Sequence, residues 1–348
     1  MKLFTCQHCS QVLYFENVAC EKCGHALGYI PETNMLSALE PVDGGWQPLA
    51  DPVRTVRFCA NARHGACNWL VTEGGDEYCA ACRHNRVVPD LAVEANVVRW
   101  RALQLAGHRL FYTLLHLGLP LRNRIDDLAH GLLFDVLADT PEKKVLTGHD
   151  EGVITLALAE GDDAERERRR VAMGEPYRTL LGHFRHEIGH YYWDVLVRDA
   201  GKLDACRAVF GDETPDYGAA LAAHYANGAP ADWQDGYVSA YATAHPWEDF
   251  AETWAHYLHI MDTLEMAESF GLRVRPKLDV SDDLTTRIDF DPYKAETIET
   301  LVDAWLPLTF AVNSLNRCMG ATDLYPFILS RPAIAKLGFV HDLVQGRV

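Results

Sequence analysis

A five-residue segment of this 348-residue chain combines two histidines with a glutamate, a set of side chains that can hold and use a metal ion. Residues 186–190 read His-Glu-Ile-Gly-His. On a helix, His186 and His190 lie one turn apart on the same face, so both can reach one ion. Glu187 stands beside them, close enough to polarise a metal-bound water. The spacing predicts a catalytic Zn2+ site, although a pair of structural histidines would give the same pattern.

A catalytic zinc ion needs three protein ligands and one open coordination position. The metzincin pattern would continue with Gly at 193 and His at 196, and Trp193 and Leu196 exclude it. Further along the chain, Pro246 can begin a helix on which Glu248 and Glu252 lie one turn apart. Glu248 could supply the third ligand. Glu252 could accept a hydrogen bond from the second nitrogen of a ligand histidine, which would fix the tautomer.

Two other interpretations of these acidic residues stay open. Asp216 could be the third ligand, as in zinc proteases of the aspartate type. Alternatively, Glu248 and Glu252 could form an exposed acidic helix face that binds no metal. The neighbouring His256 and His259 are more typical of core or helix-face histidines than of metal ligands.

Eight of the ten cysteines lie before residue 83, in two groups with the spacing of metal ligands. The first group, with two Cys-x-x-Cys pairs, consists of Cys6, Cys9, Cys20 and Cys23. The second group, with one such pair, consists of Cys59, Cys67, Cys79 and Cys82. Four thiolates leave no open position on Zn2+, so each group is expected to hold one structural zinc ion. The alternatives are iron in the first site and, in the second, His64 in place of a thiolate or two cysteines that are merely buried.

The positions of turn-forming and apolar residues divide the chain into four parts. Residues 1–30 are expected to form a zinc ribbon, and residues 53–90 a second four-cysteine module. Residues 31–52, between them, contain several Pro and Gly and are predicted to be a linker. Residues 91–348 are expected to form one mainly helical domain, because most of this part has apolar residues at helical spacing.

Several elements can be predicted within that domain. Apolar residues at helical spacing predict a long helix from near Asp90 to Leu117, and a second helical pattern covers 124–138. Alternation and β-branched residues predict a strand over 153–159. We expect this strand at the edge of a small sheet beside the catalytic site, where an extended peptide could pair with it. Residues 174–176, Gly-Glu-Pro, are a suitable start for the helix with the two histidines.

Composition narrows the classes of function. Apolar residues make up 48% of the chain and charged residues 23%, which excludes a disordered protein. Asp and Glu number 49 against 32 Lys and Arg, so the formal net charge of -17 disfavours nucleic acids and anionic membranes as partners. There is no apolar run of the roughly 18 residues that span a membrane, and no apolar segment of a signal peptide. We therefore expect a cytoplasmic protein, whose cysteines bind metal rather than form disulfides.

Taken together, these motifs resemble a bacterial family of zinc-binding metallopeptidases that carry an N-terminal zinc ribbon. The resemblance covers nearly the whole chain. It rests on the early cysteine pairs, on the segment 186–190, and on residues 245–257, which read His-Pro-Trp-Glu-Asp-Phe-Ala-Glu-Thr-Trp-Ala-His-Tyr. With the patterns above, it implies an α+β fold: a mainly α-helical, zincin-like metallopeptidase domain with a small sheet, preceded by small β-rich zinc-ribbon modules.

A few residues are also similar to the catalytic domain of anthrax lethal factor, which pairs His-Glu-x-x-His with a later Glu-x-x-Ala-Glu helix. This similarity implies Glu248 as a zinc ligand and Glu252 as the hydrogen-bond partner of a ligand histidine. It also implies that Tyr241, seven residues before Glu248, stabilises the transition state. A buried structural tyrosine is the alternative for Tyr241. The spacer is longer in this chain, so the similarity gives no role to residues 200–240.

The expected function is hydrolysis of peptide bonds by a zinc-dependent metallopeptidase of the gluzincin type, with Glu187 as the general base. Such an enzyme would use one catalytic and two structural zinc ions and act on a peptide or protein, and its ribbons could bind a protein partner. One alternative is an adaptor without activity, in which the third metal ion is structural. The other is an amidase that acts on a peptide tag or a cell-wall peptide, because the zinc chemistry is the same for all these amides.

Overall fold

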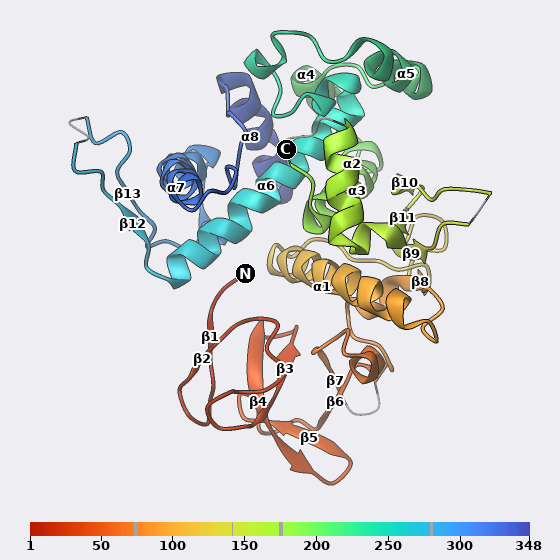
Figure 1. Cartoon of the computed structure of the whole chain (residues 1–348), viewed down its shortest axis with the longest axis vertical. Coiled ribbons are helices and arrows are strands. Elements are labelled where there is room, and N and C mark those ends of the chain that lie inside the picture. The colour runs from red at the N-terminus through yellow and green to blue at the C-terminus, as the bar shows by residue number, and fades with distance from the viewer. Residues whose placement is uncertain (73–74, 141, 174–176, 279–280) are drawn as a thin grey trace. The chain divides into compact units, whose positions relative to one another are not determined.

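The computed structural model describes residues 1–72, 75–140, 142–173, 177–278 and 281–348 (Figure 1). The chain divides into two compact units, residues 1–173 and residues 174–348. The first unit contains the two larger sheets, and the second is mainly helical. The fold class is therefore α+β, as predicted.

An antiparallel sheet of five strands, in the order β3-β4-β5-β6-β7, forms the centre of the N-terminal part. Its strands are β3 (Ala26–Ile30), β4 (Met35–Val42), β5 (Gly45–Pro48), β6 (Val56–Phe58) and β7 (Leu70–Thr72). A buried apolar cluster on this sheet consists of Ile30, Leu39, Val56 and Leu70. The preceding strands β1 (Phe4–Thr5) and β2 (Val12–Leu13) pair with each other, and the first Cys-x-x-Cys segment lies in the turn between them.

The prediction of a linker over residues 31–52 is wrong, because this segment supplies β4 and β5 of the sheet. Asp43 and Gly44 form the two-residue turn between these strands, since Val42 pairs with Gly45. Gly44 has a φ of 84°, a conformation that costs glycine little and other residues more. The glycines therefore mark a tight hairpin rather than a flexible connection.

A second sheet in the first unit has four strands in the order β10-β11-β9-β8. These are β8 (Asn85–Val87), β9 (Leu133–Leu137), β10 (Gly148–Asp150) and β11 (Val153–Ala157). Strand β11 confirms the predicted strand. However, β11 pairs with β9 on one side and β10 on the other, so the expectation of an edge strand free to bind a peptide is wrong. The predicted helix over 124–138 is also wrong, because turns lie between 124 and 130 and β9 follows them.

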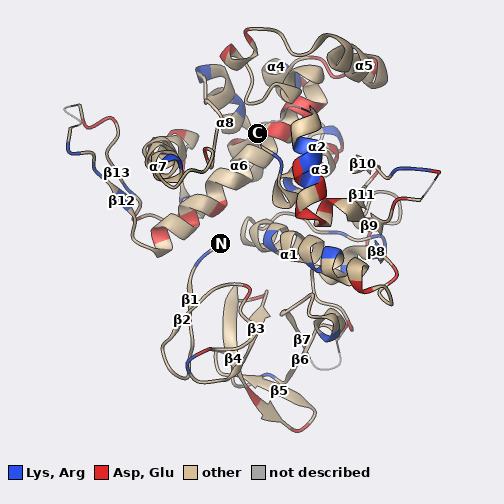
Figure 2. Ribbon diagram, in the orientation of Figure 1, with Lys and Arg blue, Asp and Glu red and all other residues tan. Residues whose placement is uncertain are grey.

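The α-helices in the described part of the first unit are α1 and α2. Helix α1 (Glu94–His116) confirms the predicted long helix and buries Trp100, Leu103 and Leu110 on one side. Helix α2 (Asp163–Met173) is strongly charged, and its ribbon in Figure 2 carries both acidic and basic residues.

Helix α6 forms the centre of the second unit (Figure 1). The helices of this unit are α3 (Leu180–Trp193), α4 (Leu203–Phe210), α5 (Tyr217–Asn227), α6 (Pro246–Ser269), α7 (Ile298–Cys318) and α8 (Arg331–Val344). The large side chains Phe250, Trp254 and Tyr257 of α6 are fully buried. Helix α3 packs along α6, and α7 and α8 contact it as well. A π-helix (Asp194–Arg198) follows α3, and the short strands β12 (Arg273–Val274) and β13 (Thr286–Arg287) pair after α6.

Candidate metal centres

Helix α3 carries both histidines and begins at Leu180. Thr179 is its N-cap residue, and the hydroxyl of Thr179 accepts a hydrogen bond from the backbone N–H of Gly182 at 3.0 Å. The predicted start at residues 174–176 lies outside the described residues. Because the helix is unbroken over 186–190, His186 and His190 lie one turn apart on it. The centroids of their two rings are 4.8 Å apart.

Helix α6 carries the two glutamates and begins at Pro246, as predicted. The ring of His245 is the N-cap and accepts a hydrogen bond from the backbone N–H of Trp247 at 3.1 Å. Gly189 allows α3 and α6 to approach closely, since a Cβ atom at this position would lie only 3.0 Å from Cα of Ala251. This close approach brings Glu248 to the histidines.

Three ligand atoms from these two helices converge. Nε2 of His186 lies 3.1 Å from Nε2 of His190 and 3.0 Å from Oε2 of Glu248. Oε2 of Glu248 lies 3.5 Å from Nε2 of His190. Ligands bound tetrahedrally to Zn2+ at their usual distances would be about 3.3 Å apart, so the spacing fits one zinc ion. In the described part of the chain, this buried Oε2 has no hydrogen-bond donor, as expected of an oxygen that faces a cation.

The charges around this group also fit a cation. Helix α6 has acidic residues and no Lys or Arg (Figure 2). Two of its carboxylates have cationic partners, Asp249 with Lys336 at 2.6 Å and Asp262 with the buried Arg185. Glu248 is only 1% exposed and, among the described residues, it forms ion pairs with His186 and His190. A buried carboxylate of this kind is stabilised strongly by a metal ion.

Glu252 orients His186. Nδ1 of His186 lies 2.7 Å from Oε1 of Glu252, and the hydroxyl of Ser239 donates to Oε2 of the same carboxylate at 2.6 Å. A proton on Nδ1 leaves the lone pair of Nε2 directed toward Glu248 and His190. Glu252 therefore has the place that the sequence predicted, and Ser239 is an additional residue that the prediction missed.

The pKa values of the site show how strongly these groups interact. Burial alone would lower the pKa of His186, but the contacts with Glu248 and Glu252 outweigh burial and raise it well above the usual value. Burial alone would raise the pKa of Glu248, but the charge of His190 and the contact with His186 hold it well below the usual value. The carboxylate is thus ionised and ready to bind a cation.

Glu187 lies next to this group without belonging to it. The residue is buried, with 8% of its surface exposed. Burial raises the pKa of Glu187, and the charges of Glu248 and Glu252 raise it further, against the opposite effect of the two histidines. Its carboxylate is therefore a stronger base than that of an exposed glutamate.

Tyr241 and Tyr217 approach the group from the region between α4 and α6. Tyr241 begins a short 3-10 helix (Tyr241–Ala244), and its ring centroid lies 5.9 Å from that of His186. Burial and the charge of Glu248 raise its pKa, so its hydroxyl stays protonated. The hydroxyl of Tyr217 donates to Oε1 of Glu248 at 2.5 Å, a contact that the sequence did not predict.

The geometry does not favour Asp216 as a ligand, and it agrees with the expectation that His256 and His259 are not ligands. Asp216 caps α5 by accepting a hydrogen bond from the backbone N–H of Ala219 at 2.6 Å, and it is not among the converging ligand atoms. His256 and His259 point elsewhere: His256 contacts the hydroxyl of Tyr325, and His259 contacts Arg185.

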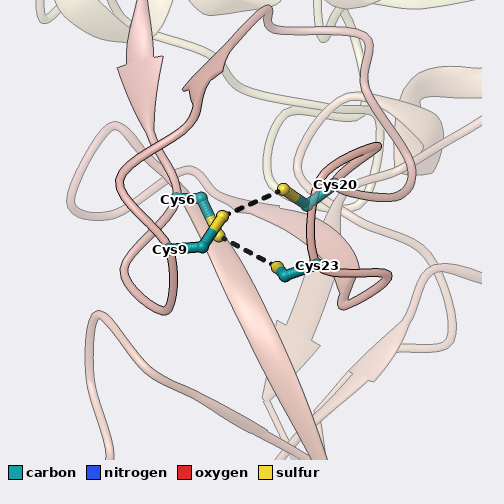
Figure 3. A group of neighbouring side chains, drawn as sticks. All are labelled: Cys6, Cys9, Cys20 and Cys23. Carbon is teal, nitrogen blue, oxygen red and sulfur yellow. Dashed lines mark hydrogen bonds between the residues drawn. The ribbon is translucent and has the colours of Figure 1, made fainter.

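The first cysteine group brings its four sulfur atoms together (Figure 3). The Sγ atoms of Cys6 and Cys23 lie 3.7 Å apart, and those of Cys9 and Cys20 lie 3.6 Å apart. Four thiolates around one Zn2+ ion would be about 3.8 Å from one another, so the geometry fits a closed tetrahedral site.

The second cysteine group also converges, with 3.8 Å between Sγ of Cys67 and Sγ of Cys79. Backbone N–H groups point at its sulfur atoms, including that of Trp69 at 3.3 Å from Sγ of Cys67. Such N–H groups stabilise thiolates, which suits metal ligation. Among the described residues, His64 is not part of this group, and its ring accepts a hydrogen bond from Arg63.

Comparison with known proteins shows the family of this chain. The model of a family described as "Putative zinc-binding metallo-peptidase" matches residues 96–343, and that of a "zinc-ribbon domain" matches residues 3–93. The chain belongs to this metallopeptidase family. The resemblance drawn from the sequence motifs is therefore confirmed, as is zinc binding as the general property. The two matches meet close to residue 94, whereas the compact units part at residue 173.

Relatives in two mycobacteria cover almost the whole chain. Proteins of Mycobacterium bovis and Mycobacterium tuberculosis, both named only as uncharacterized, are 42% identical over 350 aligned residues. The alignments cover 99% of this chain and 96% of each relative. No solved structure matches the chain, so the similarity to anthrax lethal factor stays a prediction. Within the described residues, there is no helix with the length and apolar character needed to cross a membrane.

Proposed function

We propose that this protein is a zinc-dependent metallopeptidase of the gluzincin type that hydrolyses peptide bonds at the group formed by His186, His190 and Glu248. The convergence of these three ligand atoms, from two helices far apart in the sequence, carries the proposal. The proposal includes one structural zinc ion in each cysteine group. It also includes the cytoplasm as the location, since eight free thiols in ligand spacing persist in a reducing compartment.

Bound at this group, zinc would supply a Lewis acid that activates water and polarises the carbonyl of a peptide bond. Glu187 would accept the proton of the attacking water and deliver it to the nitrogen of the leaving amine. Burial suits Glu187 to both roles, because the raised pKa allows its carboxyl group to hold the proton between the two steps. His186 would be kept in the required tautomer by Glu252.

Tyr241 would stabilise the negative charge that develops on the carbonyl oxygen. Its hydroxyl stays protonated at neutral pH and can donate a hydrogen bond to that oxygen. One donor of this type commonly contributes about 3–4 kcal/mol to a transition state. The ring lies beside His186, which is compatible with this role.

The direct test is Glu187→Gln in the full chain. The substitution keeps the size of the side chain and removes its basicity, so the variant should retain three zinc ions per chain. Hydrolysis of a peptide library should fall by roughly 100-fold to 10,000-fold, the usual contribution of a general base. Zinc content is measured by atomic emission and cleavage by mass spectrometry. Normal turnover in this variant would show that Glu187 is not the base.

The same measurements separate a peptidase from a protein that only binds zinc. A peptidase should be inhibited by a hydroxamate, which needs an open position on the metal ion, while the cysteine sites keep their zinc. If the wild-type protein holds three zinc ions but cleaves no peptide in any library, the proposal fails and a structural third site remains.

A further inference from the structure

Residues 211–237, the exposed part of the chain between α4 and α6, include Tyr217, whose side chain reaches the metal centre. Helix α5 has no buried residue, and Figure 1 shows it as an outlying helix of the second unit. Most of residues 211–237 are exposed or half-buried. Tyr217, the first residue of α5, nevertheless places its hydroxyl on Glu248, which is almost fully buried. An exposed helix thus has a polar contact inside the site.

The two oxygens of Glu248 have different neighbours. Oε2 faces the Nε2 atoms of His186 and His190, while Oε1 accepts the hydrogen bond of Tyr217. A hydrogen bond to one oxygen fixes the rotation of the carboxylate and leaves the other oxygen to face the metal position. Glu248 is therefore prepared to bind through one oxygen only.

The ring of Tyr217 is itself held by the start of α6. It packs edge-on against the rings of His245 and Trp247, with 5.4 Å between centroids in both cases. Nε2 of His245 also lies 3.2 Å from the backbone oxygen of Pro215, two residues before Tyr217. His245 and Trp247 lie just before Glu248 in the chain. The same turn of α6 therefore positions both the hydroxyl of Tyr217 and the carboxylate of Glu248 that accepts its hydrogen bond.

We propose that Tyr217 is a positioning residue of the metal centre, which holds Oε1 of Glu248 and so couples the exposed segment 211–237 to zinc affinity. This inference rests on the proposed function, because it assumes that Glu248 is a zinc ligand. It gives a role to the part of the chain for which the sequence suggested none. Tyr217 differs in this from Tyr241, whose proposed partner is the substrate.

The test is Tyr217→Phe in the full chain. The ring and its packing on His245 and Trp247 remain, and only the hydroxyl is lost. Removal of a hydrogen bond to a ligand commonly weakens metal binding by 10-fold to 100-fold. We expect a loss of this size for the third zinc ion in competition with a chelator. The zinc of the cysteine sites and the thermal unfolding curve should not change.

The matched control is Tyr225→Phe, on the same helix and 71% exposed. It also removes one hydroxyl, but the neighbour of Tyr225 is Tyr241 rather than Glu248, so zinc affinity should stay at the wild-type value. Tyr217→Ala separates the hydroxyl from the ring. If only packing of the ring matters, Tyr217→Phe will bind zinc like the wild type and Tyr217→Ala will not, and the inference is overturned.

A failure of the role proposed for Tyr217 can be distinguished from a failure of the proposed function. A wild-type protein that binds no zinc at His186 and His190 contradicts both statements. A wild-type protein with three zinc ions and peptidase activity, together with unchanged zinc affinity in Tyr217→Phe, contradicts only the role of Tyr217.

Discussion

At the scale of single residues, two carboxylates of the candidate catalytic centre, those of Glu248 and Glu252, each accept a hydrogen bond from a hydroxyl group. Tyr217 donates to Glu248, and Ser239 donates to Glu252. In both cases the remaining oxygen faces a histidine of α3. In each carboxylate, the hydrogen bond to one oxygen thus fixes the orientation of the group, and the other oxygen contacts a histidine.

His256 gives a prediction on pH dependence. Burial lowers its pKa to about 4, against a partial opposite effect of Glu252. An unfolded histidine has a pKa near 6.5, so as the pH falls below that value the unfolded chain binds a proton that the folded protein does not. The contribution to stability is complete above about pH 6.5 and is lost between about pH 6.5 and 4, with a total of about 3 kcal/mol.

The measurement is thermal or urea unfolding of wild type and His256→Gln between pH 7 and pH 4. The variant should lose less stability than the wild type as the pH falls, whatever its stability at pH 7. Equal slopes for the two proteins would contradict the buried neutral histidine. The hydroxyl of Tyr325 can donate to Nδ1 at 2.6 Å, which agrees with a neutral ring.

The sequence predicted the histidines and Glu187 more readily than the residues that orient the site. His186 and His190 are separated by one helical turn, so a local pattern is sufficient to bring them together. Glu248 could be proposed from an i,i+4 pair and from the similarity to anthrax lethal factor. Tyr217 could not, because its contact joins residues 31 positions apart and depends on how an irregular segment returns to α6.

At the scale of elements, the distance between α3 and α6 sets the geometry of the metal centre. Two ligands come from α3 and one from α6, so a shift between the helices separates the ligand atoms. The two helices approach closely at Gly189, inside the His-Glu-Ile-Gly-His segment itself. The glycine of this segment therefore matters for packing as well as for helix formation.

Gly189→Val should disrupt this contact. Even its Cβ would lie 3.0 Å from Cα of Ala251 and 3.1 Å from Cβ of Trp254, so the helices must move apart. Overpacking of this kind costs about 1–3 kcal/mol, and the third zinc ion should be lost or bound much more weakly. Gly236→Val is the control, since a Cβ there meets nothing within 4 Å and φ is -127°. Equal melting temperatures and zinc contents in both variants would contradict this view of the helix contact.

Prediction of the elements failed where one local signal was weighed without its surroundings. Asp43-Gly44 is a hairpin signal between two apolar segments, but the many Pro and Gly of residues 31–52 led to the prediction of a linker. Over 124–138, the turn at 124–130 has its own capping: the side chain of Asn123 accepts hydrogen bonds from Ile125 and Asp126. Strand β9 is buried on both faces, so it lacks the alternation that marks a strand.

At the scale of the whole molecule, the two cysteine groups and the group on α3 and α6, all within the described residues, offer a metal ion different numbers of ligands. The cysteine groups offer four thiolates each and leave no position for another ligand. The group on α3 and α6 offers two imidazoles and one carboxylate, and thus leaves a position for water. Loss of zinc from the group on α3 and α6 should therefore abolish hydrolysis, whereas loss of zinc from the cysteine groups should unfold part of the protein.

Graded treatment with phenanthroline should remove the zinc of the histidine site first. Four thiolates surround an ion more completely than three mixed ligands, and their zinc contributes to folding, so these ions should leave last. We expect peptide hydrolysis to be lost when one zinc ion per chain has been removed, while the circular dichroism spectrum stays unchanged until the other two leave.

Substitutions of single ligands test the same division. His186→Ala should contain two zinc ions and remain folded. Cys9→Ser should also lose one ion but unfold part of the first unit, whereas Cys318→Ser, at an exposed cysteine outside both groups, should keep all three. Unfolding of the first unit before activity declines would contradict the division into structural and catalytic zinc.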